Sequence, residues 1–299
     1  VFNTLLDETM ILGTAIGAAQ LGFLPIPEIQ YLAYLHNAED QLRGEACSQR
    51  FFSGGEWDNP MVVRIASLAY QKGFGGHFHN DTSLAVLRDI PGLVIALPSR
   101  GDDAVGMLRT CVAAASVGRS VCTFLEPIAL YMTKDLHEPG DGLWSFAYPA
   151  PGETVPIGEP RSYPARRRAR VLLVTYGNGV PMALRARHSL GERALDDVEI
   201  LDLRWIAPLP VGVFLDKAAH AEEVLLLDEC RRTMGGVSES LACSLAESET
   251  CRGTRLHRLC AEDSYVPLGK AAELVLPSES QVRDRLERSL ADLPDEEEG

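Results

Sequence analysis

The sequence has no paired cysteines. Its seven cysteines are an odd number, most of them in apolar surroundings, and none forms a C-x-x-C pair (Cys47, Cys111, Cys122, Cys230, Cys243, Cys251 and Cys260). Scattered cysteines of this kind are typical of reduced thiols, whereas small secreted domains carry a disulfide framework. We therefore expect a cytoplasmic protein with free thiols.

Long apolar runs are also missing. No window of about 18 apolar residues occurs and no signal-peptide pattern opens the chain, so neither a membrane span nor export is expected. The first residues, VFNTLLDE, begin without Met and already in apolar sequence. This start predicts that an amino-terminal portion is missing or lies on a longer polypeptide.

Positive charge is scarce. The chain has 28 Lys and Arg against 42 Asp and Glu, which gives a formal net charge of −14. Such a charge repels phosphate backbones, so nucleic acid is not an expected partner. The one basic cluster, PARRRARVLL, runs into an apolar strand-like segment and is typical of a solvated linker between domains.

The patterns that are present alternate between strand and helix. In the first half the expected strands are LPIPEIQYL, PMVVRIA, GLVIALP and SVCTFLEP, and the expected helices are ETMILGTAIGAAQLG, HNAEDQLRGEACSQRFF, TSLAVLRDI and DDAVGMLRTCVAAAS. The short continuous apolar runs indicate buried strands, and the longer amphipathic segments indicate helices. This alternation predicts an α/β fold with a parallel sheet flanked by helices.

A second α/β unit is expected after a break. A chain of 299 residues favours two domains, because single cores stop growing near ~250 residues. Between Tyr131 and Arg170 the pattern dissolves into Pro, Gly and charged residues, which mark a boundary. We therefore predict a first domain over 1–155, a linker over 156–168 and a smaller second domain over 169–299.

The second half repeats the alternation. Its expected strands are VLLVTYG, VEILDLRW, EVLLLDE and RLHRLCAE, and its expected helices are VPMALRARHSLGERA, VGVFLDKAAH, GGVSESLACSLAES and ESQVRDRLERSLADL.

The stretch GGHFHND, Gly75 to Asp81, is the densest concentration of reactive side chains. His77 and His79 could bind zinc, but no further ligand pair stands at zinc spacing. Asn80 and Asp81 could instead orient an imidazole that acts as a base. The residues alone leave a catalytic histidine, a hydrogen-bonded structural pair and a metal site open.

Glu8 is a second candidate. It lies among Leu, Ile and Met at the start of an expected helix, where burial would let its carboxyl hold or deliver a proton near neutral pH. The alternative is a capping or first-turn acid beside Asp7 and Thr9.

Two glycine motifs are weaker. GDG over 140–142 resembles the start of a diphosphate-binding motif but lacks its preceding strand, so a turn is expected. GNG over 177–179 follows a strand and opens a helix, where either an anion or a tight turn fits.

Five stretches carry a resemblance that covers essentially the whole chain. They are VFNTLLDETMILGTAIGAAQLGFLPIPEIQYLAY, HFHND…DIPGLVIALPSRGDDAVGMLRT, FLEPIALY, VEILDLRWIAPLP and LLLDECRRTMGGVSES. In this order they resemble the beta subunit, or fused beta half, of the thiamine-diphosphate-dependent decarboxylating component of 2-oxo acid dehydrogenase complexes. The resemblance implies a transketolase-type pyrimidine-binding domain, with its first strand missing before Val1, followed by a transketolase C-terminal domain.

The resemblance also implies roles for single residues. A Glu in the segment matching LLDE contacts the ring nitrogen of the cofactor's aminopyrimidine, which implies that role for Glu8. Proton sharing at this nitrogen activates the thiazolium carbon. Tyr34 matches the aromatic ring that stacks on the aminopyrimidine, with Tyr31 as a less favoured substitute and Gln30 as a further cofactor contact. His79 matches a histidine near the reacting carbon that assists acyl transfer, and His77 stands where the family often has Gln.

The implied activity is decarboxylation of a 2-oxo acid, of the pyruvate or branched-chain type, with acyl transfer to a lipoyl group. The diphosphate and Mg²⁺ would be held by an alpha-type half, separate or fused upstream, within a heterotetramer that serves a lipoyl acyltransferase. No metal ligands are assigned to this chain. Transketolase-like ketol transfer is the enzymatic alternative, and a non-catalytic scaffold subunit is the other.

Overall fold

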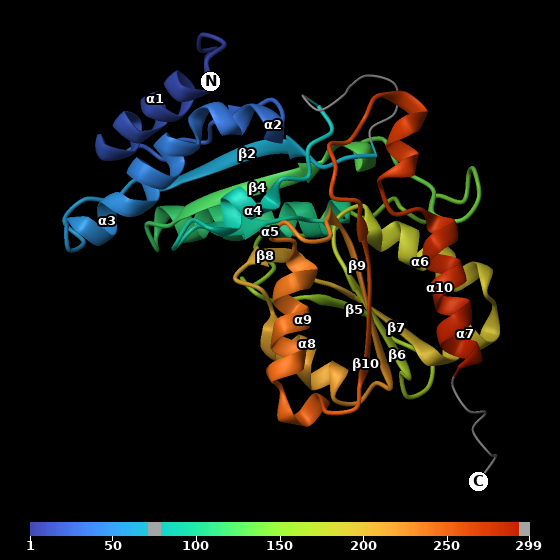
Figure 1. The fold of residues 1–299 in the computed structure, drawn as a ribbon. Coiled ribbons are helices and arrows are strands. Elements are labelled where there is room, and N and C mark those ends of the chain that lie inside the picture. Colours follow the sequence, from blue (N-terminus) through green and yellow to red (C-terminus); the bar gives the residue numbers. More distant parts are fainter. Residues whose placement is uncertain (71–78, 293–299) are drawn as a thin grey trace.

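The computed structural model describes residues 1–70 and 79–292, which fold into two α/β units around two five-stranded sheets (Figure 1). The first sheet has the strand order β1-β2-β4-β3-β8. Its strands are β1 (Glu28–Ile29), β2 (Met61–Ser67), β4 (Val121–Pro127), β3 (Val94–Ala96) and β8 (Trp205–Ala207). The first four are parallel to one another, as expected for strands joined by helical crossovers.

Helices cover both faces of this sheet. α1 (Glu8–Gln20) packs Leu12 and Ala15 into the same core as alternate residues of β2, and Asp7 caps it by accepting a hydrogen bond from the Met10 N–H at 3.1 Å. α5 (Gly101–Ser116) buries Met107 and Cys111 against the opposite face. Because both faces are covered, the strands are apolar almost throughout.

The second sheet has the order β10-β9-β6-β7-β5. Its strands are β10 (Arg255–Ala261), β9 (Glu223–Arg231), β6 (Val171–Thr175), β7 (Val198–Asp202) and β5 (Arg161–Tyr163). The first four are parallel, and β5 runs antiparallel to β7 at the edge. The segment predicted to be the linker, 156–168, therefore contributes an edge strand to this sheet.

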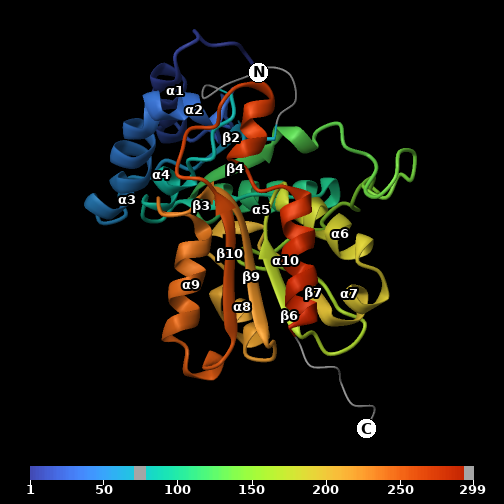
Figure 2. The same ribbon diagram turned by 45° about the vertical axis from the view of Figure 1, so that its right-hand side comes forward.

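The helices of the second unit form two layers (Figure 2). α8 (Val211–Ala218) and α9 (Val237–Glu247) pack on one face against Leu172 and Val174, whereas α6 (Gly179–Ser189), α7 (Glu192–Asp197) and α10 (Glu279–Ala291) pack on the other face against Val171 and Leu173. Successive residues of β6 thus serve opposite layers, as the alternation of side chains in a strand requires.

One extended segment contributes a strand to the sheet of each unit. VEILDLRW was predicted to be a single strand, but the structure divides it into β7 and β8, with Leu203 and Arg204 between them. Arg204 has a φ of +58°, which turns the chain. After this turn β8 leaves the second sheet and pairs antiparallel with β3 of the first. Sequence periodicity identified the extended residues but not the change of sheet between them.

Three further predicted elements differ in length or type. LPIPEIQYL holds only the two-residue β1, because Pro25 and Pro27 donate no backbone hydrogen bond to a sheet. HNAEDQLRGEACSQRFF holds a 3₁₀ turn (His36–Ala38), a π-helix (Gln41–Cys47) and α3 (Ser48–Phe52). VPMALRARHSLGERA is divided into α6 and α7 by Gly191, whose φ is +73°.

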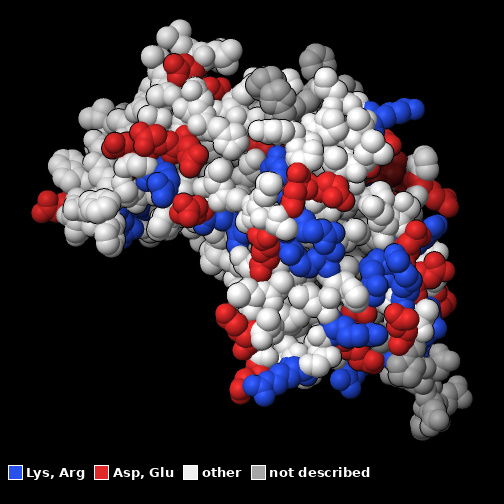
Figure 3. All heavy atoms as spheres, viewed as in Figure 1, with Lys and Arg blue, Asp and Glu red and all other residues white. Residues whose placement is uncertain are grey.

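Three further features concern membrane-spanning helices, cysteines and surface charge. No helix within the described ranges is long and apolar enough to cross a membrane. All seven cysteines are free thiols. On the face shown in Figure 3, basic and acidic side chains are interspersed over the second unit rather than gathered in one basic stripe.

Candidate functional site

Three of the predicted site residues lie together as an aromatic cluster. Tyr31 and His79 meet edge to face with ring centroids 4.6 Å apart, and Tyr34 lies 5.8 Å from Tyr31 and 6.2 Å from His79. Tyr31 directly precedes α2 (Leu32–Leu35) and Tyr34 lies within it, and the fully buried Leu32 and Leu35 fix the position of this helix. All three rings are half-buried, so each keeps a face or edge toward solvent.

Glu8 is connected to the same segment. It is the first residue of α1, and its Oε2 accepts a 3.4 Å hydrogen bond from the Nδ2 of Asn37. The hydroxyl of Thr9 donates to the Asn37 carbonyl at 3.0 Å, which holds α1 against the turn that follows α2. Asp7 caps the helix, so Glu8 is not needed for that purpose.

Two further predicted site residues, Gln30 and His77, are not part of the aromatic cluster described here. Gln30 is exposed between β1 and α2. His77 lies outside the described residues, so its role and the zinc alternative remain predictions. Among the residues that are described, no group of three or more His, Cys, Asp or Glu side chains could hold a metal ion.

Asp81 was considered as a group that could orient an imidazole of the His77 and His79 pair, but the imidazole that it binds in the structure is that of His36. The His36 Nε2 and the Asp81 Oδ2 are 2.9 Å apart, and this hydrogen bond raises the pKa of His36. Burial opposes ionisation of Asp81, yet hydrogen bonds from His36 and from Ser83 lower its pKa overall. Sequence analysis missed His36, although a histidine two residues after Tyr34 in a candidate cofactor segment was a usable signal.

The glycine motifs are structural. In GDG, Gly140 and Gly142 have φ of +90° and +62°, and the Asp141 carboxylate accepts four backbone N–H groups, which confirms a turn. In GNG, Gly177 has a φ of +52°, and a Cβ on Gly179 would lie 2.0 Å from the Thr175 hydroxyl. The tight turn therefore explains GNG.

A buried acidic cluster, also missed by the sequence analysis, ends β9. Asp228 accepts hydrogen bonds from the Tyr176 hydroxyl and from the backbone of Cys230 and Ser238. Glu229 accepts one hydrogen bond, at 2.9 Å, from the Nδ2 of Asn178. Burial is the main cause that raises the pKa of Glu229 to about 8, so its carboxyl is protonated at neutral pH.

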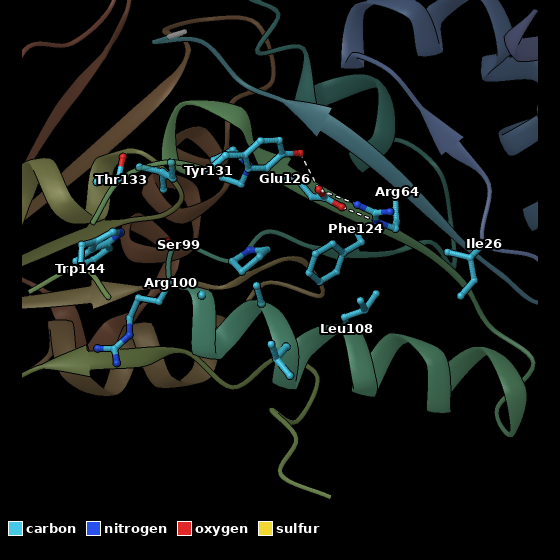
Figure 4. Close-up of a pocket in the computed structure, with 16 residues that line it drawn as sticks. Ile26, Arg64, Ser99, Arg100, Leu108, Phe124, Glu126, Tyr131, Thr133 and Trp144 are labelled. Carbon is cyan, nitrogen blue, oxygen red and sulfur yellow. Dashed lines mark hydrogen bonds and ion pairs between the residues drawn. The ribbon is translucent and has the colours of Figure 1, made fainter. Parts of the chain in front are cut away.

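A mainly apolar cavity of about 600 Å³ lies between β4 and α5 (Figure 4). Arg64 donates to Glu126 at 2.7 and 3.1 Å, and the Tyr131 hydroxyl donates to Glu126 at 2.7 Å. Because these polar groups satisfy one another, what the cavity presents is apolar, from Leu108 and Phe124 among others. The apolar face continues along α5 through Val112, beside the exposed Tyr148.

Comparison with known proteins matches both units. Residues 1–133 match the family described as "Transketolase, pyrimidine binding domain", and residues 163–282 match "Transketolase, C-terminal domain". A solved structure described as "Split gene transketolase, inactive beta4 tetramer" shares the fold, with a TM-score of 0.69 and 16% identity over 97% of this chain and 83% of that one.

Two relatives match over nearly the full length. "Pyruvate dehydrogenase E1 component subunit beta" of Staphylococcus epidermidis is 27% identical over 296 residues, 97% of this chain and 83% of the relative. "3-methyl-2-oxobutanoate dehydrogenase subunit beta" of Mycobacterium tuberculosis is 30% identical over 294 residues, 97% of this chain and 78% of the relative. The chain thus belongs to the family of 2-oxo acid dehydrogenase beta subunits, which is built from these two transketolase domains.

Proposed function

We propose that the chain is the beta-type half of a thiamine-diphosphate-dependent 2-oxo acid dehydrogenase, which decarboxylates a 2-oxo acid and passes the acyl group to a lipoyl acyltransferase. The observation that carries the proposal is the juxtaposition of Tyr31, Tyr34 and His79, with Glu8 hydrogen-bonded to the same segment. Family membership supplies the expected reaction class.

The residues present fit the pyrimidine end of the cofactor. Half-buried rings offer a stacking surface for a flat heterocycle. Within residues 1–70 and 79–292 the Glu8 carboxylate accepts one long hydrogen bond, from Asn37, and so has capacity left to contact a ring nitrogen. We propose that an alpha-type half holds the diphosphate end of the cofactor and its Mg²⁺.

In this proposal each residue of the site has a separate chemical role. Tyr34 stacks on the aminopyrimidine, and Tyr31 packs edge-on to both Tyr34 and His79, which restrains their orientation. Glu8 shares a proton at the ring nitrogen, and His79 donates a proton during acyl transfer. Thiamine diphosphate, when bound, supplies the nucleophilic carbon that attacks the 2-oxo group.

The apolar face of α5 supports assembly with a further subunit. Large apolar patches that remain exposed on a soluble protein mark interaction sites. Val105, Leu108 and Val112 share one side of α5, and Met132 nearby is 82% exposed. We place a subunit contact of the heterotetramer on this face.

The test combines the chain with its diphosphate-binding half, thiamine diphosphate and Mg²⁺, and follows 2-oxo acid decarboxylation with an artificial electron acceptor. Glu8→Ala is expected to abolish turnover, whereas Glu45→Ala, an exposed acid on the π-helix, leaves it unchanged. Undiminished activity in Glu8→Ala would favour a scaffold. Ketol transfer in place of 2-oxo acid turnover would favour a transketolase-like enzyme.

A further inference from the structure

A polar pocket of about 160 Å³ lies directly beside the aromatic cluster. Its walls include His36, Asn80, Asp81, Ser83 and Arg231. His36 follows Tyr34 by two residues and Asp81 follows His79 by two residues, so the same two segments that hold the rings also build this pocket. Arg231, at the end of β9, closes it from the second unit.

The charged and titratable side chains at the pocket are one arginine, one histidine and one carboxylate. The Arg231 Nε donates to the Ser264 carbonyl at 2.8 Å and its Nη1 to the Ser83 hydroxyl at 3.4 Å, and within the described residues no carboxylate lies at ion-pair distance from it. Asp81 is instead hydrogen-bonded to His36 at 2.9 Å, which raises the pKa of His36. Arg231 therefore presents a positive charge to the pocket that no carboxylate of the described residues pairs directly.

Asn80 provides an independent sign of a ligand. Its side chain is buried, with a residue exposure of 5%, and its Oδ1 has no hydrogen-bond partner in the part of the chain that is described. Buried polar atoms are nearly always paired, so an unpaired amide beside a pocket points to a group that the pocket receives. A carboxylate only accepts hydrogen bonds, so it would pair with the N–H group of this amide, which a rotation of the amide by 180° brings to the position of the oxygen.

On the basis of the proposed function, we propose that this pocket binds a second carboxylate of the substrate, so that the chain serves a 2-oxo acid whose side chain ends in a carboxylate. Arginine is the residue best suited to bind a carboxylate through two parallel hydrogen bonds. An aliphatic side chain placed there would desolvate the Arg231 guanidinium without pairing its charge and would leave the Asn80 amide unpaired, which costs free energy.

Binding to the full-length chain tests the pocket without requiring turnover. By calorimetry, glutarate is expected to bind, butyrate to bind at least tenfold more weakly, and Arg231→Gln to weaken glutarate binding at least tenfold. Arg232→Gln, its exposed neighbour, is the matched control and should bind glutarate normally. Equal affinity for butyrate, an unaffected Arg231→Gln, or binding of inorganic phosphate in place of glutarate would each overturn the proposal.

Turnover by the assembled enzyme separates this inference from the function on which it rests. We expect 2-oxoglutarate to have a higher kcat/KM than pyruvate or 3-methyl-2-oxobutanoate, and Arg231→Gln to raise only the KM for 2-oxoglutarate, by tenfold or more. Preferred turnover of pyruvate or 3-methyl-2-oxobutanoate would refute the pocket assignment and leave the enzyme assignment intact. No turnover of any acid would refute the function, and the glutarate titration would still decide the pocket.

Discussion

Tyr31 and His79 are in edge-to-face contact, with ring centroids 4.6 Å apart and planes inclined by 81°. The contact joins the start of α2 to the segment that leads into α4 (Leu84–Arg88). Tyr34, one helical turn after Tyr31, lies against both rings. Such pairs contribute about 0.5–1.5 kcal/mol beyond the area that they bury. The cluster is therefore rigid enough to present a stacking surface before any cofactor binds.

The stacking role of Tyr34 can be measured through cofactor affinity. Tyr34→Ala removes the ring and is expected to raise the thiamine diphosphate concentration needed for half-maximal activity by roughly fivefold, which corresponds to the ~1 kcal/mol of an aromatic contact. Tyr34→Phe keeps the ring and should behave as wild type. If Phe and Ala variants are equally impaired, the hydroxyl rather than the ring is the important group.

The role of His79 is expected to appear in only one of two assays. If His79 gives a proton during acyl transfer, His79→Asn should slow the lipoyl-dependent reaction by about 10²–10⁴-fold, the usual range for a lost general acid. Decarboxylation with an artificial electron acceptor should fall much less. The exposed His220 offers a control, His220→Asn, with no change in either assay. Equal losses in both assays would instead indicate a positioning role.

The fold was predictable to the extent that it follows from local pattern. Apolar runs such as PMVVRIA and SVCTFLEP form β2 and β4 because both faces of a parallel sheet are covered. The change of sheet at Arg204 was not predictable, because it depends on the ion pair that this residue forms with Asp103 of α5, far away in the sequence.

The site was predicted from the resemblance rather than from pattern. Spacing alone left Glu8 as a capping acid or a proton carrier, and only the structure shows that Asp7 occupies the cap. The polar pocket escaped prediction for a different reason. His36, Asp81 and Arg231 come from three separate segments, and no local pattern relates these segments to one another.

The Asp103–Arg204 pair should be important for stability. Both side chains are buried, and the Arg204 Nη2 donates to Asp103 at 2.6 Å while Arg161 binds the same carboxylate at 2.6 Å. Removing one partner of a buried pair costs about 3–5 kcal/mol when a charge remains without compensation, and a loss of about 3 kcal/mol or less is expected here because Arg161 still pairs with Asp103. Arg204→Met is expected to lose stability on this scale in urea unfolding. Arg252→Met breaks the exposed pair with Glu249 and should change little.

Assembly is expected to depend on the apolar side of α5. Val112→Asp places a charge at the cavity wall beside Tyr148, where a subunit contact would have to desolvate it. Light scattering of the mixture with the diphosphate-binding half should then show unassembled chains, with an unchanged circular dichroism spectrum. Leu274→Asp, at a residue 81% exposed on another surface, should assemble normally. Normal assembly of Val112→Asp would mean that the subunit contact does not lie on this side of α5.

Glu229 predicts a distinct dependence of stability on pH. Its pKa rises from 4.5 to about 8 in the folded protein, chiefly through burial, so folding favours the protonated carboxyl. The stability that this group contributes is fully present below its unfolded pKa and is lost as pH rises toward the folded value. Glu229→Gln keeps a neutral side chain of the same shape and should remove this loss.

Urea unfolding at pH 6 and pH 8 provides the measurement. Relative to wild type, Glu229→Gln should gain on the order of 2 kcal/mol in unfolding free energy between these two pH values, since each pH unit is worth up to ~1.4 kcal/mol for one group. Glu262→Gln, an exposed acid, should follow the wild-type pH profile. A constant difference between Glu229→Gln and wild type at both pH values would mean that Glu229 is ionised in the folded chain, with a charge stabilised by the Asn178 amide rather than suppressed by burial.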